Sequence, residues 1–306
     1  MAFRRTCFIL EDSVVIDIAQ PLGVVCHDAG GANQILAMLG EPEFQGAIGY
    51  FDGPAREPSR RAASRFEIAD DLPGLLGRVR TLVTGTGWSS RLEHDARDIA
   101  RRRGIRSIAV LDHWTNYRER FVRDGSFVLP DELWVVDEYA LDIASRTFPG
   151  LPIGLQPDRY AEQQVERIAP LSQVAGNELV YLLEPARSDW GRGEPGEFQA
   201  LRYFLDRLPQ LGLPAETAIC LRPHPSDAHG KYDAFLGERR GHRIVLDNGD
   251  LAGALSRARW VAGCQTYALT LALRAGRTVY CTLPPWAPPC QLPHRGLSHL
   301  QRMGEP

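Results

Sequence analysis

The stretch Leu22-Gly23-Val24-Val25-Cys26-His27-Asp28-Ala29-Gly30-Gly31 determines the fold class of this chain. Its first half is a continuous apolar run of strand length, and its second half is a turn that opens an apolar helical pattern through residues 35–39. A strand that is apolar on both faces and runs straight into a helix is typical of a parallel sheet covered by helices on both sides. Strand-like runs at 81–84, 107–111 and 132–136 continue the alternation. The pattern predicts an α/β fold with a Rossmann-like sheet.

The second half of the chain repeats this alternation. Strands are predicted at 179–183, 218–221, 244–246, 259–263 and 278–282, and helices at 198–208, 251–256 and 267–274. Between the halves, residues 150–176 are rich in proline and show no strand-like run, which predicts an interdomain linker. We therefore expect two Rossmann-like parallel-sheet domains, an acceptor-side domain at 1–155 and a nucleotide-donor domain at 156–306, facing a cleft.

Composition narrows the possible partners. A chain of 306 residues that is 44% hydrophobic can bury two cores. The net charge of −3 offers no electrostatic basis for binding nucleic acid, so no nucleic-acid partner is expected. Lys231 is the only lysine, and arginine supplies almost all of the positive charge.

The cysteines and the hydropathy bear on the compartment. Six widely spaced cysteines without a CxxC pair predict reduced thiols in the cytoplasm. No run approaches eighteen apolar residues and the first residues lack an apolar signal core, so neither a transmembrane segment nor a signal peptide is predicted. Peripheral membrane contact stays open. Five histidines lack metal-ligand spacing with one another, and no metal site or cofactor is predicted; these are His94, His229, His242, His294 and His299.

Three turns in the first half carry candidate substrate groups. In the first, Gly30 and Gly31 let the backbone approach a ligand, and Asp28 is either a general base for an acceptor hydroxyl or a helix N-cap. The turn lacks the GxGxxG and Walker patterns, so a dinucleotide or ATP site is not supported. In the second, 85–90, Trp88 either stacks on a sugar or covers the sheet edge.

The third turn, 112–118, is denser in polar and aromatic groups than a structural turn requires. Asp112 is the second candidate base, His113 a substrate contact, and Arg118 a partner for an acidic acceptor. The alternative is that Asp112 caps the next helix beside a half-buried histidine.

Two turns in the second half carry candidate donor groups. The segment Arg222-Pro223-His224-Pro225 follows a strand, where the prolines fix the backbone and the histidine can hold a phosphate or stabilise a leaving group as imidazolium. The segment Gly263-Cys264-Gln265-Thr266 follows another strand and enters a helix. Ligands of open parallel sheets bind outside the carboxyl ends of strands, so Arg222, His224 and Thr266 are expected in one pocket around a phosphorylated donor.

These motifs resemble glycosyltransferases of the GT-B architecture, and more narrowly the bacterial enzymes that use CMP-activated nonulosonic acids, such as sialyltransferases and capsule-type transferases. The resemblance rests on His224-Pro225, on the turn at 263–266 with Ala272-Leu273-Arg274-Ala275-Gly276 downstream, and on the acidic residue in the first glycine turn. It implies a metal-independent transfer of a sugar to a hydroxyl acceptor, with Asp28 as base and His224 on the donor phosphate. Cys264-Gln265 stands where these families carry paired serines, which weakens the donor assignment.

Two alternatives remain open at this stage. A sugar-nucleotide 2-epimerase has the same two-domain architecture and needs acidic residues near the sugar, for which Asp112, Asp137 and Glu138 are available. A non-catalytic protein that binds carbohydrate or sugar nucleotide is the other.

Overall fold

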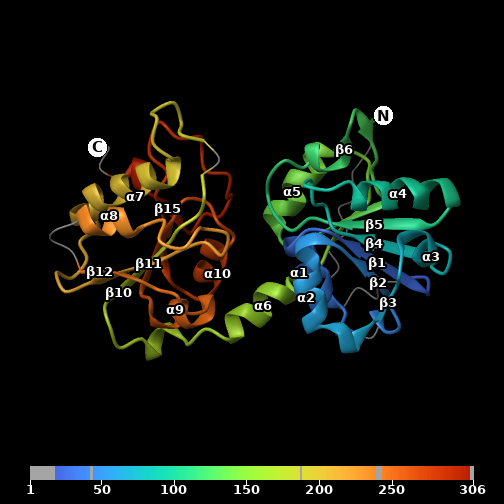
Figure 1. The fold of residues 1–306 in the computed structure, drawn as a ribbon, viewed down its shortest axis with the longest axis horizontal. Helices are drawn as coiled ribbons and strands as arrows, with labels where there is room; N and C mark the ends of the chain where they lie inside the picture. The colour runs from blue at the N-terminus through green and yellow to red at the C-terminus, as the bar shows by residue number, and fades with distance from the viewer. Residues whose placement is uncertain (1–17, 42–43, 187, 239–242, 304–306) are drawn as a thin grey trace, which may run out of the picture. The chain divides into compact units, whose positions relative to one another are not determined.

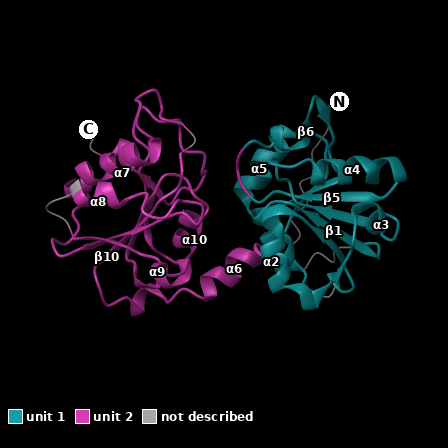
Figure 2. Ribbon diagram, viewed as in Figure 1, with its two compact units in different colours: residues 1–112, 116–157 teal, residues 113–115, 158–306 magenta. Residues whose placement is uncertain are grey.

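The computed structural model describes residues 18–41, 44–186, 188–238 and 243–303. It divides into two compact units, each containing one large parallel sheet (Figure 1). Unit 1 comprises residues 1–112 and 116–157, and unit 2 comprises residues 113–115 and 158–306 (Figure 2). Among the described residues, no helix is long and apolar enough to cross a membrane.

Unit 1 contains a seven-stranded sheet in the order β3-β2-β1-β4-β5-β8-β9. Its strands are β1 (Leu22–Cys26), β2 (Ile48–Phe51), β3 (Glu67–Ile68), β4 (Thr81–Thr84), β5 (Arg106–Val110), β8 (Glu132–Val135) and β9 (Ile153–Leu155). Its helices are α1 (Ala29–Met38), α2 (Arg56–Arg61), α3 (Leu72–Leu76), α4 (Leu92–Arg103) and α5 (Glu138–Thr147), and β6 (Val122–Arg123) and β7 (Ser126–Phe127) form an antiparallel hairpin.

Both faces of the unit 1 sheet are buried, as the apolar strands predict. Along β1, Val24 packs with α1 and the residues around α2, whereas Val25 packs with α3 and α4 on the opposite face. The side-chain alternation of a single strand therefore supplies two separate cores. Gly23 lies on the same face as Val25, where a Cβ would come within 2.8 Å of Leu75 Cδ2 and displace that side chain.

Unit 2 contains a six-stranded parallel sheet in the order β12-β11-β10-β13-β14-β15. Its strands are β10 (Glu178–Leu182), β11 (Ala218–Arg222), β12 (Ile244–Leu246), β13 (Trp260–Gly263), β14 (Thr278–Cys281) and β15 (Leu297–His299). Its helices are α6 (Arg159–Glu166), α7 (Gly196–Arg207), α8 (Asp233–Glu238), α9 (Leu251–Arg257) and α10 (Ala268–Arg274). One core joins Tyr181 and Leu221 of the sheet to Phe204 of α7.

The structure confirms an α/β fold with two Rossmann-like parallel sheets and corrects several predicted elements. Residues 150–176 are not free of strands: β9 is the edge strand of the first sheet, and α6 follows it. Only three residues long and interrupted by Gly154, β9 is too short to give an apolar run. The predicted strand at 278–282 corresponds to β14, and a further strand that the sequence did not reveal, β15, pairs with it. The strands β2 and β3 were also missed. The cleft and the 155/156 boundary remain predictions.

The strand order fixes where ligands can bind in each unit. In the first sheet the connections run outward from β1 to β2 and β3, and then switch across to β4 on the other side. The second sheet does the same from β10 to β11 and β12, and then to β13. Ligands of open α/β sheets bind at such switch points, outside the carboxyl ends of the strands. Ligand-binding residues are therefore expected in the turns after β1, β4, β10 and β13.

Candidate functional site

Three strand ends of unit 1 bring Asp28 and Asp112 into one cluster. Asp28 follows β1, Gly85–Ser90 follow β4, and Asp112 follows β5. Asp28 caps α1, its Oδ1 accepting a long 3.4 Å hydrogen bond from the amide of Gly30. The cap interpretation is thus correct for Asp28, but it does not exclude the base, since one oxygen remains for another partner.

Arg120 is the cation of this cluster, and the sequence analysis missed it. Its Nη1 lies 2.7 Å from Asp112 Oδ1, and the two side chains are only 12% and 13% exposed. The same nitrogen donates to Thr86 Oγ1 at 3.0 Å, so Arg120 connects the turns after β4 and β5. Arg118, the arginine singled out from the sequence, is exposed and lies over the Phe127 ring at 4.7 Å. Arg120 lies in the 3-10 helix Glu119–Phe121 and Arg118 directly precedes it, and spacing alone does not distinguish the two arginines.

The glycines of the first turn are required by close protein contacts. A Cβ on Gly30 would lie 2.0 Å from Asp112 Oδ2, and one on Gly31 would lie 3.0 Å from Gly85 Cα. A Cβ on Gly87 would lie 2.7 Å from the Cβ of Asp28. These protein contacts explain the glycines, and their role in making room for a substrate stays a prediction. The glycines let the carboxylates and the two turns approach one another.

Helix α4 supports the cluster from behind with two buried charged residues. Glu93 is fully buried, and its Oε1 accepts from the amides of His27 at 2.7 Å and Asp28 at 3.4 Å. Arg97, which is 1% exposed, donates to Thr84 Oγ1 at 2.9 Å and to the carbonyl oxygen of Gly85 at 3.1 Å. Burial raises the pKa of Glu93 and lowers that of Arg97 to about 10. Helix α4 therefore fixes the turns after β1 and β4.

The electrostatics of the cluster single out Asp28. Burial, followed by the charge of Asp112, raises the pKa of Asp28, although the Gly30 amide and Arg120 oppose the shift. Asp112 is held by Arg120 in a short ion pair. A carboxylate with a raised pKa is a stronger base than an ordinary aspartate, so Asp28 is the better placed of the two to accept a proton.

The remaining predicted residues of the unit 1 loops lie nearer to the surface. Trp88 is 45% exposed, which leaves surface on which a ring can stack, and both interpretations of this residue stay predictions. His113 belongs to the short segment grouped with unit 2, where its Nδ1 lies 3.3 Å from Thr115 Oγ1. His27 lies beside the cluster, with its Nδ1 3.4 Å from Ser89 Oγ.

In unit 2, Arg222 and His224 lie at the carboxyl end of β11. Arg222 Nη1 donates to the carbonyl oxygen of Gly249 at 2.5 Å, and the side chain is 17% exposed. The amide of Ser226 donates to His224 Nδ1 at 3.2 Å, so this nitrogen is an acceptor and the proton of the neutral ring is on Nε2. Burial lowers the pKa of His224. These contacts and the lowered pKa favour a neutral ring that donates from Nε2, and whether His224 acts as an imidazolium stays a prediction.

The loop that carries His224 is held down by the only lysine of the chain. Lys231 Nζ lies 2.6 Å from Asp227 Oδ1 and 2.7 Å from Glu197 Oε1, which is on α7. The other oxygen of Asp227 accepts from the amide of His224 at 2.9 Å and from the Tyr232 hydroxyl at 3.1 Å. We call this group of Glu197, Asp227 and Lys231 the lysine bridge. It orients the backbone from which the His224 ring projects.

Glu184, at the end of β10, is a second candidate that the sequence analysis missed. Its carboxylate accepts a hydrogen bond from the amide of Gln265 in the turn after β13. Burial raises its pKa to about 7, although the amides of this turn, including that of Thr266, oppose the shift. The signal in the sequence was its position directly after a predicted strand at 179–183.

The order of the strands places the predicted donor residues around Glu184. β11 and β13 pair with β10 on opposite sides, so Arg222 and His224 lie on one side of the Glu184 turn and Thr266 on the other. A Cβ on Gly263 would lie 3.0 Å from the carbonyl oxygen of Leu182, which explains a glycine there. Thr266 Oγ1 accepts a 3.5 Å hydrogen bond from the amide of Ala268, the first residue of α10. Pro225 is exposed beside His224.

Comparison with known proteins identifies the fold. No model of a known protein family matches the chain, and no curated protein matches it. Among solved structures, a putative UDP-N-acetylglucosamine 2-epimerase from Listeria monocytogenes matches with a TM-score of 0.57 at 14% identity, over 86% of this chain and 79% of that one.

Two further solved structures match equally broadly. UDP-GlcNAc 2-epimerase from Methanocaldococcus jannaschii has a TM-score of 0.52 at 10% identity, over 85% of this chain and 83% of that one. Anabaena HepE in complex with UDP and glucose has a TM-score of 0.52 at 12% identity, over 86% of this chain and 80% of that one. At these identities the likeness concerns the fold, and this chain has the fold of the GT-B type, built from two Rossmann-like units.

Proposed function

We propose that this protein is a glycosyltransferase that uses a nucleotide sugar and transfers the sugar to a hydroxyl acceptor. The observation that carries the proposal is the carboxylate pair of unit 1, in which Asp112 forms an ion pair with Arg120 while Asp28 has a raised pKa. Such a pair gives one oriented base at a ligand-binding edge of the sheet. The GT-B fold supports a nucleotide-sugar substrate.

In the proposed reaction, Asp28 accepts the proton of the acceptor hydroxyl as its oxygen attacks the anomeric carbon of the donor. The bond from that carbon to the leaving phosphate oxygen breaks, and the phosphate takes the electron pair. Arg222 would bind the phosphate through its planar fork, and His224 would donate an N–H hydrogen bond from Nε2. Gly30, Gly31, Trp88, His113 and Arg118 remain acceptor-side predictions, and Pro225, Gly263 and Thr266 remain donor-side predictions.

The donor is the finer part of the proposal. The motif at His224-Pro225 favours a CMP-linked nonulosonic acid, whereas the matched structures favour a UDP sugar. Titration of the protein with CMP, UDP and GDP by calorimetry separates these possibilities. Tight binding of CMP supports a CMP-linked donor. A preference for UDP would mean that the donor is a UDP sugar instead.

A sugar-nucleotide 2-epimerase is the second candidate, favoured by Glu184. Epimerisation at a carbon next to the anomeric centre requires proton removal and return, and a carboxyl with a pKa of about 7 can do both near neutral pH. The carboxylate of Asp137, considered for this reaction, caps α5 through the amide of Ala140 at 2.7 Å. Deuterium incorporation from heavy water into UDP-GlcNAc, without an acceptor, would identify the epimerase.

The variant that tests the donor role is His224→Ala, with His229→Ala as its matched control. His229 is exposed and lies five residues further along the same segment. Loss of a preorganised donor to the leaving group is expected to lower turnover by about 10²-fold or more, and the control should be unchanged. Equal turnover of both variants would remove His224 from the mechanism. Binding of glycan without nucleotide binding or turnover would instead indicate a non-catalytic binding protein.

A further inference from the structure

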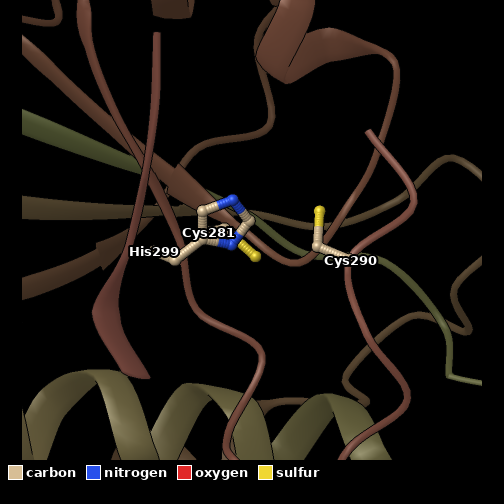
Figure 3. A group of neighbouring side chains, drawn as sticks. All are labelled: Cys281, Cys290 and His299. Atoms are coloured by element: carbon tan, nitrogen blue, oxygen red, sulfur yellow. The ribbon is translucent and has the colours of Figure 1, made fainter. Parts of the chain in front are cut away.

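Three side chains that can ligate a soft metal converge at the end of unit 2. Cys281 ends β14, Cys290 follows a proline-rich turn, and His299 ends β15. One ligand atom from each lies within 4.8 Å of the other two (Figure 3). We propose that Cys281, Cys290 and His299 form a binding site for Zn²⁺.

The sheet itself places two of the three ligands together. Cys281 and His299 are register partners in the parallel pair β14 and β15, so their side chains leave the same face of neighbouring strands. Such strands are about 4.8 Å apart, which brings a thiol and an imidazole into reach of one ion. Their separation by eighteen positions along the chain explains why spacing in the sequence did not predict the site.

The third ligand is delivered by the segment between the strands. Residues 284–289 contain four prolines, and the amide of Ala287 donates to the carbonyl oxygen of Pro284 at 2.9 Å, which makes a turn. The chain then returns, and the amide of Gln291 donates to the side chain of Gln265 at 3.1 Å. Cys290 therefore lies at a fixed point of a stiff loop.

The chemistry of the three groups suits zinc. Two thiolates and one imidazole are ligands that Zn²⁺ favours, and three protein ligands leave a fourth position for water or a carbonyl oxygen. Zn–S and Zn–N bonds of about 2.3 and 2.1 Å place ligand atoms roughly 3.5 to 3.8 Å apart, so only small side-chain rotations are needed. In addition, Nδ1 of His299 is buried without a hydrogen-bond partner, which is unfavourable unless a further ligand is present.

The site lies behind the turn that follows β13. The carbonyl oxygen of Cys264 is 3.1 Å from the Cys281 sulfur and 3.9 Å from the Cys290 sulfur, and the next amide in the chain, that of Gln265, donates to Glu184. An ion here would cross-link β14, β15 and the proline-rich turn. Its role is structural: it would hold the Cys264–Thr266 turn in place, and no reaction step passes through it.

The test measures metal binding by the full chain. The protein is stripped with a chelator, reloaded with zinc, and its metal content is measured by mass spectrometry. We expect one equivalent of zinc and a higher melting temperature on reloading, because an ion that binds only the folded state stabilises it. Cobalt added in place of zinc should give the charge-transfer absorption of thiolate ligands.

Variants separate this site from adventitious binding. Cys281→Ser and His299→Gln should each lower zinc affinity by roughly 10²-fold or more. The matched controls are Cys220→Ala, a buried cysteine on β11, and His229→Gln, an exposed histidine, which should bind zinc as the parent does. Zinc binding that is substoichiometric, or equal in the site variants, overturns the proposal. A disulfide between Cys281 and Cys290 in protein purified without oxygen also overturns it.

Discussion

At the scale of single residues, Asp28 combines a structural and a chemical task. It caps α1, yet its carboxyl is buried beside Asp112, and both burial and this neighbour disfavour its charge. Sequence reasoning identified both aspartates, because each follows a strand at a ligand-binding edge. It preferred Asp28 and kept Asp112 as the second candidate, but it missed Arg120, which pairs with Asp112 from the short 3-10 helix Glu119–Phe121.

Replacing Asp28 by Asn should abolish most of the turnover and leave nucleotide binding intact. Asn retains the shape and the capping oxygen but cannot accept the proton, so turnover should fall by about 10² to 10⁴-fold. Steady-state kinetics and calorimetry with the nucleotide measure the two effects. Asp71→Asn is the control, because Asp71 caps α3 through the amide of Gly74 at 2.7 Å away from the carboxylate cluster. Normal turnover by Asp28→Asn would move the base to Asp112, tested by Asp112→Asn.

The same substitution should stabilise the fold at neutral pH. Below the ordinary aspartate pKa of about 4, the carboxyl is protonated in both folded and unfolded chains and the raised pKa has no effect. As pH rises through the raised pKa of the folded state, ionisation costs more in the folded than in the unfolded chain, and Asn avoids this cost. The melting temperature of Asp28→Asn should exceed that of the parent at pH 7, and the difference should vanish near pH 3. An equal or lower melting temperature at pH 7 would mean that the carboxyl is not destabilised by burial.

At the scale of elements, strand-to-helix turns determine how the unit 1 cluster is built. Sequence patterns predicted β1 and β4 closely, because continuous apolar runs are strong signals. They did not reveal that α4 buries Glu93 and Arg97 beneath the turns. Only the packing of α4 against β1 and β4 shows which of its charged side chains point inward.

Gly30→Ala tests the close approach of α1 to Asp112. Alanine is favoured over glycine inside a helix by roughly 0.5 to 1 kcal/mol, yet its Cβ would meet Asp112 Oδ2. The clash should prevail and lower the free energy of unfolding by about 1 to 3 kcal/mol in a urea titration. Gly40→Ala, with no atom within 4 Å of its Cβ, should change stability by about 0.5 kcal/mol or less. If the two variants were equally stable, Asp112 would have to move without cost.

Glu93→Ala tests the support that α4 gives to the first turn. The variant leaves the part-buried amide of His27 without its 2.7 Å partner, which should lower the free energy of unfolding by about 1 to 3 kcal/mol. Asp98→Ala is the control on the same helix, because Asp98 pairs with Arg101 and Arg102 at the surface, and such pairs contribute about 0 to 1 kcal/mol. Chemical denaturation of both variants measures the difference. Equal losses would show that the buried acceptor is not needed.

At the scale of the whole molecule, the chain consists of two units with separate sheets and separate cores. The sequence predicted the two sheets because parallel strands covered on both faces are apolar throughout. It did not predict the short edge strands β3, β9 and β15, whose two or three residues carry no periodicity. The convergence of Cys281, Cys290 and His299 depends on the edge strand β15, so the sequence did not predict it either.

Separate units imply a local response to the nucleotide. Binding of CMP or UDP should slow amide hydrogen exchange in the turns at 183–186, 223–227 and 264–266 of unit 2, where the donor-side residues lie. The exchange of β2 and β3 in unit 1 should be unaffected, because stabilisation by a ligand is greatest in the segments that hold it. Hydrogen exchange with mass spectrometry measures both. Protection confined to unit 1 would place the nucleotide on the other sheet.

The lysine bridge also makes this chain a natural single-site probe for amine chemistry. With one lysine in 306 residues, acylating reagents can modify a single side-chain amine. Although burial opposes the shift, the hydrogen bonds from Lys231 to Asp227 and Glu197 raise the pKa of this amine, so its nucleophilic neutral form is rare. The rate of acylation therefore reports how often the segment carrying His224 detaches from α7. No engineered label is needed to follow that motion.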